Sequence, residues 1–182
     1  MSNLSMQGGA TGTGTVSLVA PVTNTNRTIN LPDSNGTIVT SATAGVPING
    51  PAFSAYQSSS QSVTTATYTK VLFQTEEFDT NSNFASSTFT PTVAGYYQIN
   101  SAVRFSSVNS TMRLALYKNG VVHKLLADSG GTSQSSNHGG CVVYLNGSTD
   151  YIEIYVYLST TTGLGANAAE TYFNSAMVRS AT

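Results

Sequence analysis

The chain has no tryptophan, a single cysteine and few charged residues. Charged residues make up 8% of it, against about 25% in an ordinary globular protein, and the seven basic residues form no run. Such a sequence offers no electrostatic footprint for nucleic acid and no polybasic patch for a membrane surface. No window approaches the roughly 20 apolar residues that span a bilayer. We therefore expect neither nucleic-acid binding nor membrane insertion.

Residues that commonly carry chemistry are also scarce. Cys141 lies in a strand-like apolar run, 139–145, which predicts a buried core thiol rather than a catalytic one. His123 and His138 are the only histidines, too few for a zinc site. The sequence has no Gly-x-Ser-x-Gly motif and no convincing pair of acids for glycoside hydrolysis. We predict no catalytic residues and a protein that is not an enzyme.

Apolar residues alternate with other residues through 151–158, as in a half-buried strand. The face expected to point into the core carries Ile152, Ile154, Val156 and Leu158. The opposite face carries Tyr151, Glu153, Tyr155 and Tyr157. Three tyrosines make this second face too aromatic for ordinary exposure, and large exposed apolar patches usually mark contacts. We predict that Tyr151, Tyr155 and Tyr157 form a subunit interface.

Similar alternation over 99–105 and 112–117 predicts further half-buried strands, and no useful helical periodicity appears anywhere. Short strands separated by Gly, Asn and Ser turns are typical of a sandwich or jelly roll. The length of 182 residues suits one domain plus an appendage. We predict an all-β fold, an antiparallel jelly-roll sandwich over 51–182, preceded by an extended β-prone arm over 1–50.

Aromatic, acidic and glycine residues recur at a fixed spacing through 73–97. The positions are Phe73, Asp79, Phe84, Phe89, Gly95 and Tyr97. This pattern resembles the signature of the globular head of the first complement component's q subunit, a trimeric jelly roll of the tumour-necrosis-factor type. The gap from Phe84 to Phe89 is shorter than the family's, and Ile99 and Ser101 replace aromatic residues.

Three further segments, 51–55, 116–121 and 172–178, fall in the order of the family's opening strand, central hairpin and closing strand. The resemblance covers residues 51–180. It implies a trimeric head whose core holds the six signature residues.

The one carboxylate cluster is Glu76, Glu77 and Asp79. Carboxylates gathered on a loop can hold calcium through oxygen ligands, and some heads of the resembled family bind calcium. The alternative is a solvated loop, because the spacing is not that of a recognised calcium loop. Asp79 also occupies the acidic signature position, where a structural turn role is the simpler interpretation.

Residues 1–50 contain no aromatic residue and are rich in Gly, Thr, Asn and Ser, so they cannot form a globular core alone. β-prone pieces at 15–21, 27–32 and 37–40 surround a turn at 33–36. The combination resembles the short repeat that precedes the distal domains of bacteriophage tail-fibre and virion-surface proteins. It implies an arm that attaches the head to other virion proteins. Residues 1–9 also lack the pattern of a secretory signal.

These observations predict a non-enzymatic bacteriophage virion protein, assembled in the host cytoplasm as a homotrimer. Its roles would be a surface fibre, a capsid decoration or a receptor-binding head. A secreted bacterial adhesin or signalling head of the same fold is the alternative, and an enzyme ranks last. The long polar loops 106–110, 128–138 and 159–169 are the predicted contacts to a host-surface receptor or glycan, with His138 a candidate glycan contact.

Overall fold

The computed structural model describes residues 50–107, 111–131, 136–160 and 162–181. The predicted arm, residues 1–50, lies outside this part of the chain except for Gly50. Every regular element of the described residues is a strand. The described residues contain no helix that is long and apolar enough to cross a membrane. The strands are β1 (Ala52–Tyr56), β2 (Gln61–Val63), β3 (Thr69–Lys70), β4 (Thr75–Asp79), β5 (Phe84–Ala85), β6 (Thr88–Phe89), β7 (Gly95–Arg104), β8 (Met112–Lys118), β9 (Val121–Ser129), β10 (Ser136–Leu145), β11 (Ile152–Leu158), β12 (Thr162–Leu164) and β13 (Tyr172–Ser180).

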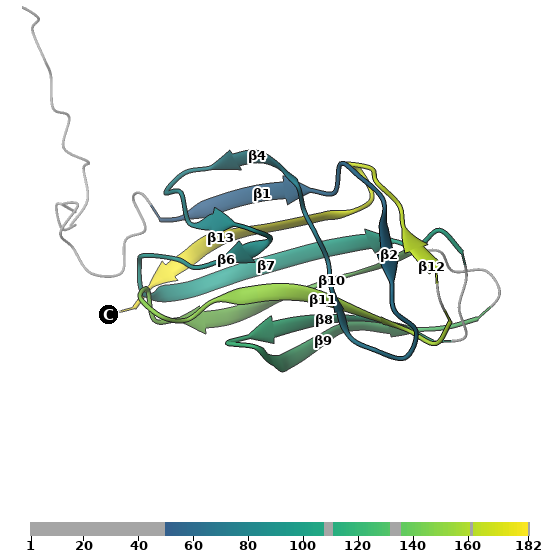
Figure 1. Cartoon of the computed structure of the whole chain (residues 1–182). Coiled ribbons are helices and arrows are strands. Elements are labelled where there is room, and N and C mark those ends of the chain that lie inside the picture. Colours follow the sequence, from purple (N-terminus) through teal and green to yellow (C-terminus); the bar gives the residue numbers. More distant parts are fainter. Residues whose placement is uncertain (1–49, 108–110, 132–135, 161, 182) are drawn as a thin grey trace, which may run out of the picture. The chain divides into compact units, whose positions relative to one another are not determined.

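Two antiparallel sheets form a sandwich (Figure 1). The five-stranded sheet has the order β10-β7-β13-β1-β4, and the six-stranded sheet has the order β5-β6-β11-β8-β9 with β3 paired to β11. β2 and β12 pair with each other as a small third sheet. Strands that are far apart in the sequence lie side by side, as β1 and β13 do. The prediction of an all-β antiparallel jelly roll is confirmed.

The core lies between the two sheets and follows the period-two pattern of the sequence. In β11 the residues predicted to point inward, Ile152, Ile154, Val156 and Leu158, are all fully buried. The alternating residues of β8 and β7 behave alike, since Met112, Leu114, Ile99 and Val103 are also fully buried. The sequence pattern therefore located the inward faces of β7, β8 and β11 correctly, although Glu153, placed on the outward face of β11, is buried as well.

Phenylalanines fill one end of this core. The ring of Phe53 in β1 lies 4.5 Å from that of Phe84, 4.6 Å from that of Phe89 and 4.8 Å from that of Phe173. Stacked and edge-to-face pairs at these distances add to the free energy of burial. Phe53 thus joins strands β1, β5, β6 and β13, which belong to both sheets.

The signature residues occupy structural positions. Phe73, Phe84, Phe89 and Tyr97 are buried, and burial raises the pKa of Tyr97 to about 12, while its hydroxyl donates to the carbonyl of Val93. Gly95 is needed for close approach, because a Cβ there would lie 2.5 Å from the carbonyl oxygen of Arg179. The carboxylate of Asp79 accepts hydrogen bonds from the amides of Asn81 and Phe84, so it holds the turn after β4.

The β8–β9 hairpin turns at Asn119 and Gly120, which both have positive φ, at 53° and 80°. This is the turn geometry that Asn-Gly pairs favour in two-residue hairpins. The turn is fixed to the β10–β11 connection by Asp150, whose carboxylate accepts hydrogen bonds from the Asn119 side chain and the Asn146 amide and pairs with Lys118 at 2.8 Å. Burial alone would raise the pKa of Asp150, but these partners lower it below its usual value.

This carboxylate makes stability depend on pH in a defined direction. The folded-state pKa lies below the unfolded value of about 3.9, so the stabilisation is complete above that value and is lost as pH falls through the lower folded-state pKa. Asp150→Asn should cost about 1–3 kcal/mol at pH 7, and its deficit relative to wild type should shrink towards pH 2. Urea unfolding at pH 7, 5, 3 and 2 measures both. The exposed Arg113–Asp128 pair supplies the control, because Asp128→Asn should change little.

Several sequence predictions need correction. Cys141 is half-buried rather than buried, because it packs against the core from β10, an edge strand of its sheet. The predicted loop 128–138 is shorter, since β9 extends to Ser129 and β10 begins at Ser136, which places His138 in a strand. The predicted loop 159–169 contains β12, whose Leu164 is fully buried. Of the predicted loop 106–110, residues 108–110 lie outside the described residues.

Candidate self-association surfaces

Most of the large exposed apolar side chains lie in two groups, and Phe78 lies on a third surface beside two glutamates. We call Tyr96, Val142, Tyr144 and Val178 the tyrosine–valine face. We call residues 121–125 the β9 edge and residues 76–78 the β4 edge. Grouped exposed apolar residues are typical of contact surfaces.

The tyrosine–valine face lies on the side of the five-stranded sheet that faces away from the core. Register brings it together, because Tyr144 of β10 is opposite Tyr96 of β7, and Tyr96 is opposite Arg179 of β13. The two tyrosine rings lie 5.5 Å apart. The neighbouring residues on this side are polar, and Asn100 bonds to Asn174. The sheet therefore presents an apolar end next to a neutral polar middle.

A hollow of about 680 Å³ opens at the apolar end. Its lining residues are Tyr96, Tyr144, Val178, Arg179, Ser180 and Ala181. No ion pair within the described residues involves the guanidinium of Arg179. The hollow combines aromatic walls with a cation, a composition enriched at protein interfaces.

A second, more polar cleft of about 250 Å³ includes Arg104, Ser136, His138, Glu170 and Tyr172. The guanidinium of Arg104 pairs with the carboxylate of Glu170 at 2.5 Å, so these two charges in the cleft neutralise each other. His138, the candidate glycan contact, is exposed here. The structure thus places His138 in a polar depression of the sheet rather than on a loop.

The β9 edge consists of five successive exposed residues at the margin of the six-stranded sheet. Val121 is 66% exposed, and Val122 and Leu125 are about half exposed. The pairing with β8 shifts register twice, which is typical of β-bulges in edge strands. His123 and Lys124 lie between these apolar residues, and burial followed by the charges of Lys118 and Lys124 lowers the pKa of His123.

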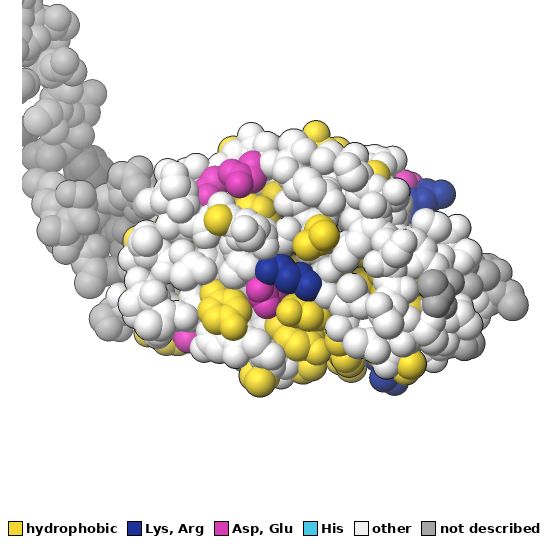
Figure 2. Space-filling model, in the orientation of Figure 1, with side chains coloured by type: hydrophobic (Ala, Val, Ile, Leu, Met, Phe, Trp, Pro, Cys, Tyr) yellow, Lys and Arg dark blue, Asp and Glu magenta, His cyan; other side chains and the backbone are white. Residues whose placement is uncertain are grey.

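The β4 edge is the margin of the five-stranded sheet and carries Glu76, Glu77 and Phe78. Figure 2 shows the acidic side chains over β4. Ser54 donates to Glu77, and Phe78 is 51% exposed. Within the described part of the chain, no three His, Cys, Asp or Glu side chains are placed to hold a metal ion. The carboxylate of Asp79 accepts hydrogen bonds from the amides of Asn81 and Phe84.

Of the tyrosines predicted as a subunit interface, Tyr155 and Tyr157 lie in β11 and pack against neighbouring tyrosines, and Tyr151 directly precedes β11. The ring of Tyr155 stacks 3.9 Å from that of Tyr117, and Tyr157 lies 5.4 Å from Tyr68. Arg113 lies over the ring of Tyr157. Figure 2 shows an apolar patch amid a largely neutral surface. All these tyrosines are half-buried within the single chain, so much of the aromatic surface is already covered.

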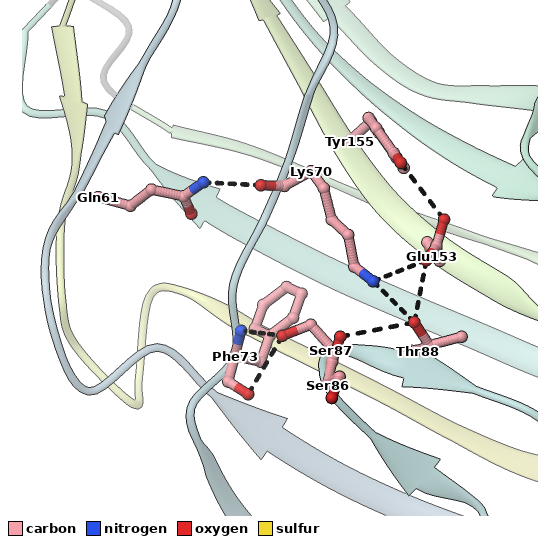
Figure 3. A network of polar contacts seen from close by, with 8 residues as sticks. All are labelled: Gln61, Lys70, Phe73, Ser86, Ser87, Thr88, Glu153 and Tyr155. Carbon is pink, nitrogen blue, oxygen red and sulfur yellow. Dashed lines mark hydrogen bonds and ion pairs between the residues drawn. The ribbon is translucent and has the colours of Figure 1, made fainter.

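A polar network borders this patch (Figure 3). Lys70 donates to Glu153 at 2.6 Å and to Thr88 at 2.7 Å, and Thr88 donates to the same Glu153 oxygen at 2.9 Å. Tyr155 points its hydroxyl at the other oxygen. Because every strong donor and acceptor here has a partner, the network joins β3 and β6 to β11 rather than offering a reactive group.

The side chains most often used in catalysis are not arranged for it in the described residues. Burial, the largest effect, raises the pKa of the Cys141 thiol although Lys124 opposes it, so the reactive thiolate is disfavoured at neutral pH.

Sequence reasoning missed the tyrosine–valine face. The signal existed, because Tyr96 alternates with the buried Tyr97 and Tyr144 lies between the buried Val143 and Leu145. The sequence predicts a strand-like run over 139–145, which includes Tyr144, but it does not indicate which strands become neighbours. The register of β7 with β10 is what places the two tyrosines together.

Comparison with solved structures shows the fold. The globular domain of zebrafish complement 1qA protein superposes with a TM-score of 0.57 and 20% identity, covering 72% of this chain and 99% of that one. Murine APRIL gives a TM-score of 0.56 at 16% identity, covering 71% and 100%. The Eiger tumour-necrosis-factor protein of S. frugiperda gives 0.53 at 9% identity, covering 74% and 96%. No family model and no curated protein matches the sequence.

Proposed function

We propose that this protein is a non-enzymatic, homotrimeric head that displays contact surfaces on a bacteriophage virion. The observation that carries the trimer is the exposed tyrosine–valine face, on a fold shared with the complement 1qA globular domain and APRIL. An aromatic sheet face of this kind is stabilised when another subunit covers it. The proposal needs no cofactor.

The virion part of the proposal is supported by the sequence of the arm. Its Gly-, Thr- and Asn-rich segments with short β-prone pieces resemble those of phage fibre proteins, as described above. The low charge of the head also suits a role in tight, neutral packing against other subunits. In this role the arms bind other virion proteins and the heads project outward.

Trimeric assembly would strengthen the attachment of such a head to its target. Three weak sites held on one particle bind with higher avidity than one site, without any new contact. Residues 106–107 and 159–169, which include part of the predicted contact loops, carry mainly hydroxyl and small side chains that suit a receptor or glycan. Binding would therefore depend on assembly rather than on one deep pocket.

Two measurements test the proposal. Light scattering on the purified full chain should give three times the chain mass of 19.0 kDa. Immunogold microscopy of phage particles with antibody against residues 51–182 should label the capsid or the tail. Capsid gold means decoration, and tail gold means receptor binding. Unlabelled particles with a trimeric protein would overturn the virion role and favour the secreted adhesin or signalling head.

A further inference from the structure

Eight of the thirteen charged side chains in the described residues form ion pairs with one another. The four ion pairs are Lys70–Glu153, Arg104–Glu170, Arg113–Asp128 and Lys118–Asp150. The basic residues left over are Lys124 and Arg179, and the acids left over are Glu76, Glu77 and Asp79. In a chain with so few charges, those without an ion pair stand out.

Of the charges left over, Lys124, Glu76 and Glu77 lie on sheet edges, whereas Arg179 lines the hollow beside the tyrosine–valine face. Lys124 lies on the β9 edge among Val121, Val122 and Leu125. Glu76 and Glu77 lie on the β4 edge beside the exposed Phe78. Asp79 is excluded because two backbone amides donate to its carboxylate and it is half-buried, whereas Glu77 accepts a hydrogen bond from Ser54 but is exposed. One edge is therefore apolar and basic, and the other is apolar and acidic.

The two edges lie on opposite sides of the sandwich (Figure 1). β4 ends the five-stranded sheet and β9 ends the six-stranded sheet, so one copy cannot bring its own two edges together. A contact between different surfaces of two identical chains is heterologous, and repeating it gives a closed ring when the rotation allows. This is the relation that a homotrimer requires.

We propose that the β9 edge of one copy docks on the β4 edge of the next, with Lys124 facing Glu76 and Glu77. Val121, Val122 and Leu125 then pack around Phe78. The proposal rests on the proposed homotrimer and assigns the part of its subunit contact that lies beside the tyrosine–valine face. Complementary charge fixes the register and rejects the wrong orientation, while the apolar residues supply most of the affinity.

The β9 edge is also continuous with the tyrosine–valine face. β10, which carries Val142 and Tyr144, comes so close to β9 that a Cβ at Gly139 would lie 2.3 Å from the carbonyl oxygen of Leu126. Lys118 of β8 donates to the Tyr144 carbonyl. A copy that covers the β9 edge would therefore approach the tyrosine–valine face from β10.

Charge reversal tests the pairing in the full chain. Two variants are made, Lys124→Glu and the double substitution Glu76→Lys with Glu77→Lys. Each should raise the protein concentration at which half of the trimer has dissociated by at least about tenfold at low salt, because like charges would face each other. Combining all three substitutions in one chain should restore assembly. Arg113→Glu, on the outward side of the six-stranded sheet, is the matched control, since combining it with the β4 changes should restore nothing. Light scattering over a dilution series measures each variant, and circular dichroism confirms folding.

The outcomes separate this inference from the trimer itself. A monomeric wild-type protein overturns both the homotrimer and the proposed pairing of the β9 and β4 edges. A trimeric wild type whose reversed variants stay trimeric, or whose combined variant fails to recover, overturns the pairing alone. Carbodiimide crosslinking of mixed light and ¹⁵N-labelled chains gives a second test, because mass spectrometry should find Lys124 joined to Glu76 or Glu77 between differently labelled chains. Trimers that yield only other crosslinked pairs would contradict the assignment.

Discussion

Replacing Phe53 by alanine should lower the free energy of unfolding of the head by about 3–5 kcal/mol. Phe53 is fully buried, and its ring contacts those of Phe84, Phe89 and Phe173. The loss combines the transfer energy of the ring with the cavity that remains where the two sheets meet. A fall of about 10–20 °C in melting temperature is the corresponding shift for a domain of this size. Calorimetry and urea unfolding measure it.

Phe78→Ala is the matched control for this prediction. Phe78 is the same residue type but is 51% exposed on the β4 edge. Its loss should change the stability of the isolated head by less than about 1 kcal/mol. Equal effects of the two substitutions would show that the phenylalanine cluster does not hold the sandwich together. Measurements at low protein concentration keep subunit contacts from contributing.

Replacing Tyr144 by lysine should convert the trimer to monomers. Tyr144 is 43% exposed, so the single chain loses little, but a second subunit would have to bury an ammonium group in the tyrosine–valine face. Lys118 lies 5.9 Å from the Tyr144 ring and would repel the new charge. Light scattering at micromolar concentration should report the chain mass with unchanged circular dichroism.

The interface predicted from sequence provides the comparison. Tyr155→Lys with Tyr157→Lys places two charges on the outward side of the six-stranded sheet, where Tyr117 and Tyr68 contact these rings. Our proposal expects this variant to remain trimeric. Monomers from it, with trimers from Tyr144→Lys, would instead support the interface of Tyr151, Tyr155 and Tyr157.

The sequence predicted which side of a strand is buried better than it predicted which strands pair with each other. Alternation identified the buried side of β11, because apolar residues such as Ile152 and Val156 recur at every second position and no polar residue interrupts them on that side. The family resemblance, rather than alternation, placed a hairpin at 116–121, where the Asn119–Gly120 turn lies. Alternation does not say which strand lies beside which, since pairings such as β1 with β13 join distant segments. Surfaces built across strands therefore had to come from the structure.

Short strands were missed for a related reason. β12 has three residues, Thr162–Leu164, and reads as a polar loop because its stability comes from pairing with Gln61–Val63 rather than from its own composition. Cys141 was placed too deep because its apolar neighbours do not reveal that β10 is an edge strand. In both cases the missing information was the strand order of the sheet.

The position of β13 has a consequence for synthesis on the ribosome. This last strand lies between β1 and β7, so the five-stranded sheet cannot be completed until residues 172–180 have left the exit tunnel. Until then β1 has only β4 beside it, and β7 exposes one row of hydrogen-bonding groups. Nascent chains are therefore at greatest risk of pairing with one another just before translation ends. A stop codon before Tyr172 should yield protein that enters inclusion bodies rather than a smaller soluble head.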